Sequence, residues 1–116
     1  MKKRIVVAYE GRETKEAMPR LLLSGTCTAD AEVPVVIAGA ENELGRRIGV
    51  ARAMQRSEHG SISFEIELDD FSIIDELHPA IYLAKPFNSI ENGVHIFDAG
   101  EIKEICFFQK LNAWGE

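Results

Sequence analysis

The chain lacks the features that define several large classes of protein. None of its apolar runs approaches the roughly 20 residues needed to span a bilayer, which argues against a membrane protein. The apolar stretch at residues 5–9 is shorter than a signal-peptide core, and Glu10 and Glu13 follow it closely. We therefore expect a protein that is made in the cytoplasm.

Cysteine and histidine are too few and too scattered for a metal site. Cys27 and Cys106 lie far apart, as do His59, His78 and His95, and no Cys-x-x-Cys or His-x-x-x-His spacing occurs. We expect neither a metal nor a cofactor. Both cysteines fall in apolar segments typical of strands, which favours buried free thiols, although the sequence alone leaves a disulfide open.

Clustered basic residues are also missing. The chain has 13 lysines and arginines against 19 acidic residues, a net charge of −6. Its basic groups, residues 2–4 and the pair Arg46 and Arg47, have acidic neighbours in the sequence. Nucleic-acid binding draws on clustered positive charge, so we expect protein partners and no nucleic acid.

No repeat, linker or low-complexity segment divides the chain, which predicts one domain over residues 1–116. Its clearest pattern is "SISFEIELDD" at 61–70, in which apolar and polar residues alternate as in a half-buried antiparallel strand. Residues 44–56 fit a helix or a strand. Gly45 and Gly49 weaken the helix, and the alternating strand needs a neighbour, so we predict a strand.

The stretch "SEHG" between these two strands contains the residue types of a nucleophile, an acid and a base. Ser57, Glu58 and His59 would be a catalytic cluster only if they met in a hydrogen-bonded line beside an oxyanion site. Neighbouring residues at a hairpin tip diverge instead, and Gly60 offers the positive φ that a turn uses. We predict a turn without catalytic function.

The remaining segments complete the expected fold. "RIVVAY", "RLLLSGTCTA" (with a bulge or bend at Gly25), "VPVVIAG" and "AIYLAKPF" predict strands, and "DDFSIIDELHP" predicts a short helix that Pro79 ends. "NSIENG" predicts a turn, and "VHIFDAG" and "EIKEICFFQKL" a hairpin-like pair joined at "DAG". The fold class is mainly β, a small antiparallel barrel or sandwich with one short helix. The predicted inward-facing residues are Val35, Ile37, Ile48, Val50, Ile62, Phe64, Ile66, Ile81, Leu83, Ile105 and Phe107.

The order of these segments resembles the bacteriophage prohead proteases, which share a small β-barrel with herpesvirus assemblin. "VPVVIAG" is similar to the strand that precedes the family's catalytic histidine, and "RRIGVARAMQRSEHGSISFEIEL" to the hairpin that follows. "FSIIDELHP" resembles the family's helix, "AIYLAKPF" its nucleophile strand and "EIKEICFFQKLNA" its closing strand. The resemblance spans residues 33–113 and consists of apolar and turn positions.

The chain departs from this family at the positions that carry its chemistry. Where the family has its histidine, this sequence has Ala38, Gly39 and Ala40, and where it has the nucleophilic serine, this sequence has Ala80. Alanine and glycine can neither attack a carbonyl nor accept a proton. The resemblance therefore implies a barrel without the protease chemistry, and we expect no catalytic residues.

This reasoning predicts a non-enzymatic phage structural protein, a capsid decoration or capsid-associated protein made in the host cytoplasm and carried in the virion. We expect it to bind a capsid protein, as a small homo-oligomer, through an extended N-terminal arm (residues 1–19) and the loop "KPFNSIENG". Two alternatives stay open: a small capsid maturation serine protease with a displaced nucleophile (Ser24, Ser57, Ser61, Ser63 or Ser89), and a small acidic inhibitor of a host or viral enzyme. The predicted partner-binding residues are Lys2, Lys3, Arg4, Lys85, Phe87, Asn88 and Trp114.

Overall fold

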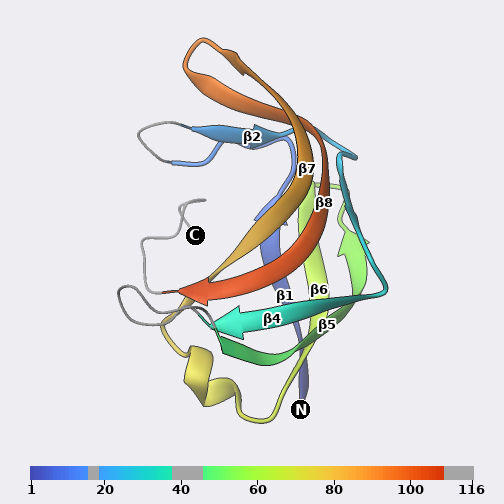
Figure 1. Ribbon diagram of the computed structural model, residues 1–116, viewed down its shortest axis with the longest axis vertical. Coiled ribbons are helices and arrows are strands. Elements are labelled where there is room, and N and C mark those ends of the chain that lie inside the picture. Colours follow the sequence, from blue (N-terminus) through green and yellow to red (C-terminus); the bar gives the residue numbers. More distant parts are fainter. Residues whose placement is uncertain (16–18, 38–45, 109–116) are drawn as a thin grey trace.

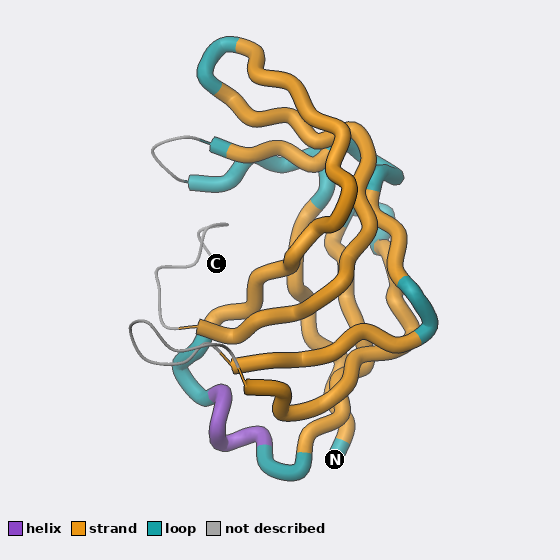
Figure 2. Tube along the Cα trace, viewed as in Figure 1, coloured by secondary structure: helices purple, strands orange, loops and turns teal. Residues whose placement is uncertain are grey.

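Strands form nearly all of the regular structure (Figures 1 and 2). The computed structural model describes residues 1–15, 19–37 and 46–108, with the backbone alone at 85–88 and 98–99. The mainly β fold predicted from the sequence is confirmed. The elements are β1 (Lys2–Tyr9), β2 (Arg20–Leu22), β3 (Cys27–Ala29), β4 (Glu32–Ile37), β5 (Arg46–Arg56), β6 (Ser61–Leu68), the 3-10 helix η1 (Phe71–Ile74), β7 (His78–Glu91) and β8 (Val94–Phe108).

Strand β8 organises the sheet. One of its edges pairs antiparallel with β7 along the length of both strands. Its other edge pairs in turn with β2, β3 and β4, all in parallel, which the sequence patterns did not predict. Antiparallel pairing then continues from β4 through β5 and β6 to β1. The outermost strands β1 and β7 come within 8 Å of each other at their Cα atoms, so the sheet curls around its core.

The core follows from the alternation in β6. Ile62, Phe64 and Ile66 are fully buried and Leu68 is 2% exposed, while the residues between them are only partly buried. The strand predicted at 44–56 is confirmed as β5, which pairs antiparallel with β6. Of the residues predicted to face inward, those fully or almost fully buried are Val35, Ile62, Phe64, Ile66, Ile105 and Phe107, and those partly buried are Ile37, Ile48, Val50, Ile81 and Leu83.

The N-terminal segment corrects one prediction. The strand predicted at "RIVVAY" is confirmed as part of β1, which pairs with β6 from Lys2 to Tyr9, so residues 2–9 are an integral strand and not an extended arm. Val7 and Ala8 in this strand belong to the core. Deletion of the segment would therefore expose an edge of β6 and part of the core, because β1 covers both.

Two strand boundaries also differ from the prediction. "RLLLSGTCTA" forms two short strands, β2 and β3, because the chain turns at Gly25, where φ is +78°. The expected hairpin at "DAG" is wrong, since β8 runs through residues 98–100 without a turn. Gly100 instead lies close against the side chain of Leu83. A close contact of this kind is a second reason, besides a turn, for glycine to occur in a strand.

The β7–β8 turn lies at Asn92 and Gly93, inside the predicted "NSIENG" segment but confined to its end. Their φ angles of +51° and +78° are both positive, as a two-residue type I′ hairpin turn requires. Residues 85–91, expected to form a loop, therefore belong to β7. The outer end of this hairpin extends away from β4, β5 and β6 (Figure 1).

The short helix is present as η1, and it ends earlier than predicted. The side chain of Asp70 caps it by accepting a hydrogen bond from the backbone N–H of Ser72 at 2.9 Å. The helix ends at Ile74, and Pro79 already lies in β7. Among the described residues, no helix has the length and apolar character to cross a membrane.

Candidate functional site

The turn at residues 57–60 joins β5 to β6, as predicted. The Oγ atom of Ser57 accepts hydrogen bonds from the backbone N–H groups of His59 (3.2 Å) and Ser61 (3.1 Å) and from the Ser61 hydroxyl (2.7 Å). The imidazole of His59 instead lies 3.5 Å from the carboxylate of Glu58, and both side chains are almost fully exposed. Ser57 thus serves the turn, and the described contacts do not place the His59 ring at its hydroxyl.

Replacing His59 with alanine is expected to change the free energy of unfolding by no more than about 0.5 kcal/mol. The physical reason is that an exposed turn side chain loses little solvent contact on folding. Chemical unfolding of the variant and the parent chain measures the difference. A loss above about 1 kcal/mol would contradict this interpretation of the turn.

The most elaborate polar cluster of the described chain is centred on Glu10, which the sequence analysis did not single out. Its side chain is fully buried, and its carboxylate accepts hydrogen bonds from the backbone N–H groups of Gly25 (3.1 Å) and Cys27 (3.0 Å). The guanidinium of Arg56 donates to both carboxylate oxygens and, at 2.8 Å, to the carbonyl of Cys27. One side chain thus ties the end of β1 to the start of β3 and the end of β5.

The turn at 57–60 is attached to the same cluster. The backbone N–H of Glu10 donates to the carbonyl of Gly60 at 2.7 Å. Gly60 has a φ of +85°, and a Cβ atom there would collide with the carbonyl of Glu10. Only glycine fits this close contact without displacement, so Gly60 positions the turn as well as forming it.

The charges of this cluster are mutually stabilised. Burial raises the pKa of Glu10, but the hydrogen bonds from Arg56, Cys27 and Gly25 outweigh it, and the net pKa lies below the ordinary 4.5. Burial, together with the nearby Glu10 carboxylate, raises the pKa of the Cys27 thiol to about 11. Cys27 therefore stays protonated at neutral pH and is not an activated nucleophile. The cluster therefore has the properties of a structural element that holds β1, β3 and β5 together.

Of the basic residues predicted to contact a partner, Lys2 forms ion pairs within the chain. We use the term ionic ladder for Lys2, Glu65, Glu67, Arg52 and Glu32. Lys2 lies 3.8 Å from both Glu65 and Glu67, and Arg52 lies 3.7 Å from Glu67 and 3.4 Å from Glu32. Exposed pairs of this kind add little stability.

Lys3 and Arg4 are engaged in the same region. The ammonium of Lys3 lies 4.8 Å from the centroid of the Phe71 ring, a cation–π contact. Arg4 donates to the hydroxyl of Ser63 at 3.1 Å and to the carbonyl of Ala53 at 2.9 Å. Lys2, Lys3 and Arg4 therefore each make a contact within the chain while remaining exposed.

The other predicted partner-binding residues are divided between β7 and the C-terminus. Lys85, Phe87 and Asn88 lie within β7, where the structure describes their backbone but not their side chains. Trp114 lies outside the described residues. Ala38, Gly39 and Ala40, which stand where the prohead proteases have their catalytic histidine, also lie outside them. Ala80 lies in β7 as expected, opposite Cys106 of β8.

The histidines and cysteines are not assembled into a metal-binding group within the described residues. His78 begins β7, opposite Phe108, rather than ending a helix. His95 lies in β8, and its ring meets that of Phe97 edge-on, with centroids 6.0 Å apart. Cys27 and Cys106 are both free thiols.

Exposed apolar side chains identify a different surface. After Met1, the most exposed large hydrophobic residues of the described chain are Tyr82 (62%) and Ile90 (61%), and both lie on β7. Ile90 belongs to what we term the hairpin tip, residues 89–95, at the outer end of β7 and β8 (Figure 2). The sequence patterns placed Tyr82 between the inward-facing Ile81 and Leu83, and Ile90 in the predicted turn at 88–93, but they gave no reason to single out either residue as a contact.

Comparison of the chain with protein-family models, with curated proteins and with solved structures found no match. The resemblance to prohead proteases therefore rests on the pattern of apolar and turn positions in residues 33–113. Inferences about function depend on the surfaces described above.

Proposed function

We propose that this chain is a non-enzymatic phage structural protein, a capsid decoration or capsid-associated protein, that docks through the β7–β8 hairpin. The observation that carries the proposal is that Tyr82 and Ile90, the most exposed large hydrophobic residues of the described chain after Met1, both lie on β7. Exposed apolar side chains gain free energy when a partner covers them, and a projecting hairpin brings them to a partner without rearrangement of the core.

The distribution of charge also favours the β7–β8 hairpin as the contact surface. In the ionic ladder, Lys2 and Arg52 are already paired with acidic side chains of neighbouring strands, so these charges are engaged within the chain. The hairpin tip carries one acidic residue, Glu91, next to the exposed Ile90. The contact that it offers is small. On a shell with repeated symmetric sites, several weak contacts made by a small homo-oligomer add up to firm attachment.

The reason to expect capsids in particular is the resemblance of the order of segments in the sequence to the prohead proteases, together with Ala80 at the position of the family's nucleophile. A barrel of this kind that lacks the protease chemistry is suited to binding on the same shell. The serine-protease alternative predicts labelling by a fluorophosphonate probe, and the inhibitor alternative predicts tight binding to a soluble enzyme with no affinity for shells.

Replacing Ile90 with glutamate is expected to reduce co-sedimentation of the chain with phage shells by at least about tenfold. These shells would be assembled from the capsid protein of the same genome. A buried isoleucine contributes roughly 1.5–3 kcal/mol when it leaves water, and a buried carboxylate adds a penalty. The matched control is Ile73→Glu, an exposed isoleucine in η1 at the other end of the molecule, which should bind as the parent chain does.

Both variants must retain the unfolding midpoint of the parent chain for the comparison to hold. Equal binding by Ile90→Glu and the parent would refute docking through the hairpin. No binding by the parent chain to shells would refute the capsid assignment itself.

A further inference from the structure

The outward face of β7 and β8 combines an exposed aromatic ring with a carboxylate. Residues that lie directly opposite each other in a sheet share a face. Ile81 is paired with Ile105, which is fully buried, so this pair faces the core. The next pair along, Tyr82 and Glu104, faces outward, and the Tyr82 side chain is 62% exposed.

Small side chains flank the tyrosine along its strand. Ala80 and Ala84 lie two residues to either side of Tyr82 and are paired with Cys106 and Glu101. Methyl groups at these positions leave the phenol ring open to an approaching side chain. A partner can therefore reach the ring and Glu104 together.

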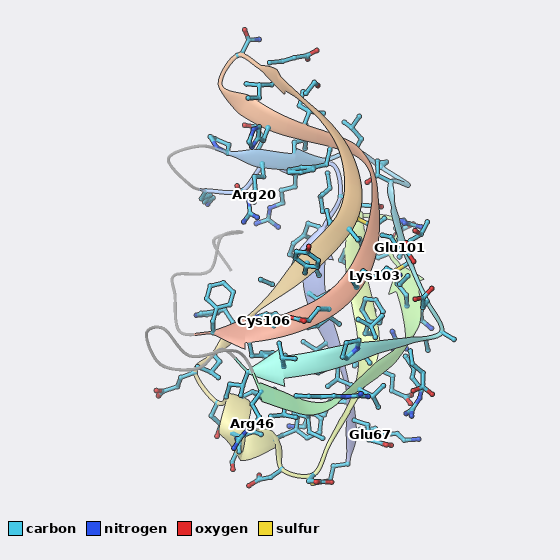
Figure 3. The ribbon with its side chains drawn as sticks, in the orientation of Figure 1. Arg20, Arg46, Glu67, Glu101, Lys103 and Cys106 are labelled. Atoms are coloured by element: carbon cyan, nitrogen blue, oxygen red, sulfur yellow. The ribbon has the colours of Figure 1, made fainter. Side chains whose placement is uncertain are left out.

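Glu104 differs from the other acidic residue on this part of β8. Glu101 lies 2.7 Å from the ammonium of Lys103, which also reaches Asp30 at 3.3 Å (Figure 3). Among the side chains that the structure describes, no cation pairs with Glu104. The Tyr82–Glu104 pair thus combines an accessible π face with a carboxylate that no described side chain neutralises.

We propose that Tyr82 and Glu104 form a recognition site for an arginine side chain of a protein partner. A guanidinium stacks on an aromatic face and at the same time donates hydrogen bonds to a carboxylate, and this pair of groups supplies both. The net charge of −6 attracts a basic segment toward the chain. The inference rests on the proposed function, because it names the chemistry of the partner's contact beside the hairpin tip.

The test is an NMR titration of the ¹⁵N-labelled full chain with the peptide acetyl-Gly-Arg-Gly-Arg-Gly-amide. A control peptide carries citrulline, the neutral isostere, in place of arginine. The expected result is a set of shift changes at the amides of residues 80–84 and 101–106 with the arginine peptide, and much smaller changes with the citrulline peptide. Added salt should weaken the response.

Substitutions separate the two contributions. Tyr82→Leu keeps an apolar side chain and removes the π face, and Glu104→Gln removes the charge; each should weaken peptide binding by about two- to fivefold. Glu58→Gln, which alters an acid on the exposed 57–60 turn, is the matched control and should leave the affinity unchanged.

Equal responses to the two peptides would overturn the proposed arginine site. Shift changes confined to residues 69–76, a segment with four acidic side chains, would also overturn it. The outcome is distinguishable from failure of the proposed function. A chain that binds shells through Ile90 but shows no arginine response refutes only this inference, whereas a chain with an arginine response and no affinity for shells refutes the capsid assignment.

Discussion

Replacing Phe64 with alanine is expected to lower the free energy of unfolding by about 3–5 kcal/mol. Phe64 is fully buried in the middle of β6, and its ring packs in the same cluster as side chains from β1, β4 and β8. Removal of the ring loses its transfer free energy and leaves a cavity that the curled sheet cannot fill without shifting several strands. Chemical denaturation at neutral pH, with the slope of the transition recorded, measures the loss.

The matched control is Tyr82→Ala, which truncates an aromatic side chain in a strand of the same sheet but at a site that is 62% exposed. This variant should lose no more than about 1 kcal/mol. Comparable losses at the two positions would mean that the inward face of β6 is not the core of the protein.

Replacing Glu10 with glutamine is expected to cost about 2–4 kcal/mol at neutral pH. The neutral amide has one oxygen to accept hydrogen bonds, so the donors at Gly25, Cys27 and Arg56 can no longer all be satisfied. Arg56 keeps part of its hydration, because its side chain is 34% exposed, and this moderates the loss. Glu67→Gln, which removes an exposed carboxylate of the ionic ladder, is the control and should cost less than about 1 kcal/mol.

The contribution of Glu10 to the free energy of unfolding should also depend on pH, and it should decrease as the pH falls. The folded state lowers the pKa of Glu10 below its ordinary 4.5, so ionised Glu10 stabilises the fold above that pH. The stabilisation is lost as the pH falls through the lowered pKa. The difference in unfolding free energy between the parent chain and Glu10→Gln should therefore shrink under acidic conditions. A difference that stays constant from pH 7 to pH 3 would show that the charge of Glu10 is not what stabilises the cluster.

The local patterns of the sequence were sufficient to predict the strands that have one apolar and one polar face. Strict alternation in residues 61–68 predicted both a strand and its buried face, because a one-residue change in phase would move Phe64 into water. The turn at 57–60 followed from its position between two strands and from Gly60. The apolar and glycine content of residues 92–100 was ambiguous, since a glycine in a strand marks either a turn or a close contact, and only Gly93 marks the turn.

The sequence by itself determined that this protein is a mainly β domain, with the inward residues of β6 and the turn that precedes it, because these depend on contacts between near neighbours in the chain. Only the tertiary structure decided that the strand at residues 2–9 pairs with β6 within the sheet and that Glu10 is buried against Arg56, 46 residues away. The same holds for the place of Ile90 within β7 and not in a turn. Burial of a side chain depends on which distant strands cover it, and the parallel pairing of β2, β3 and β4 with β8 leaves no local signal in the residues that it joins.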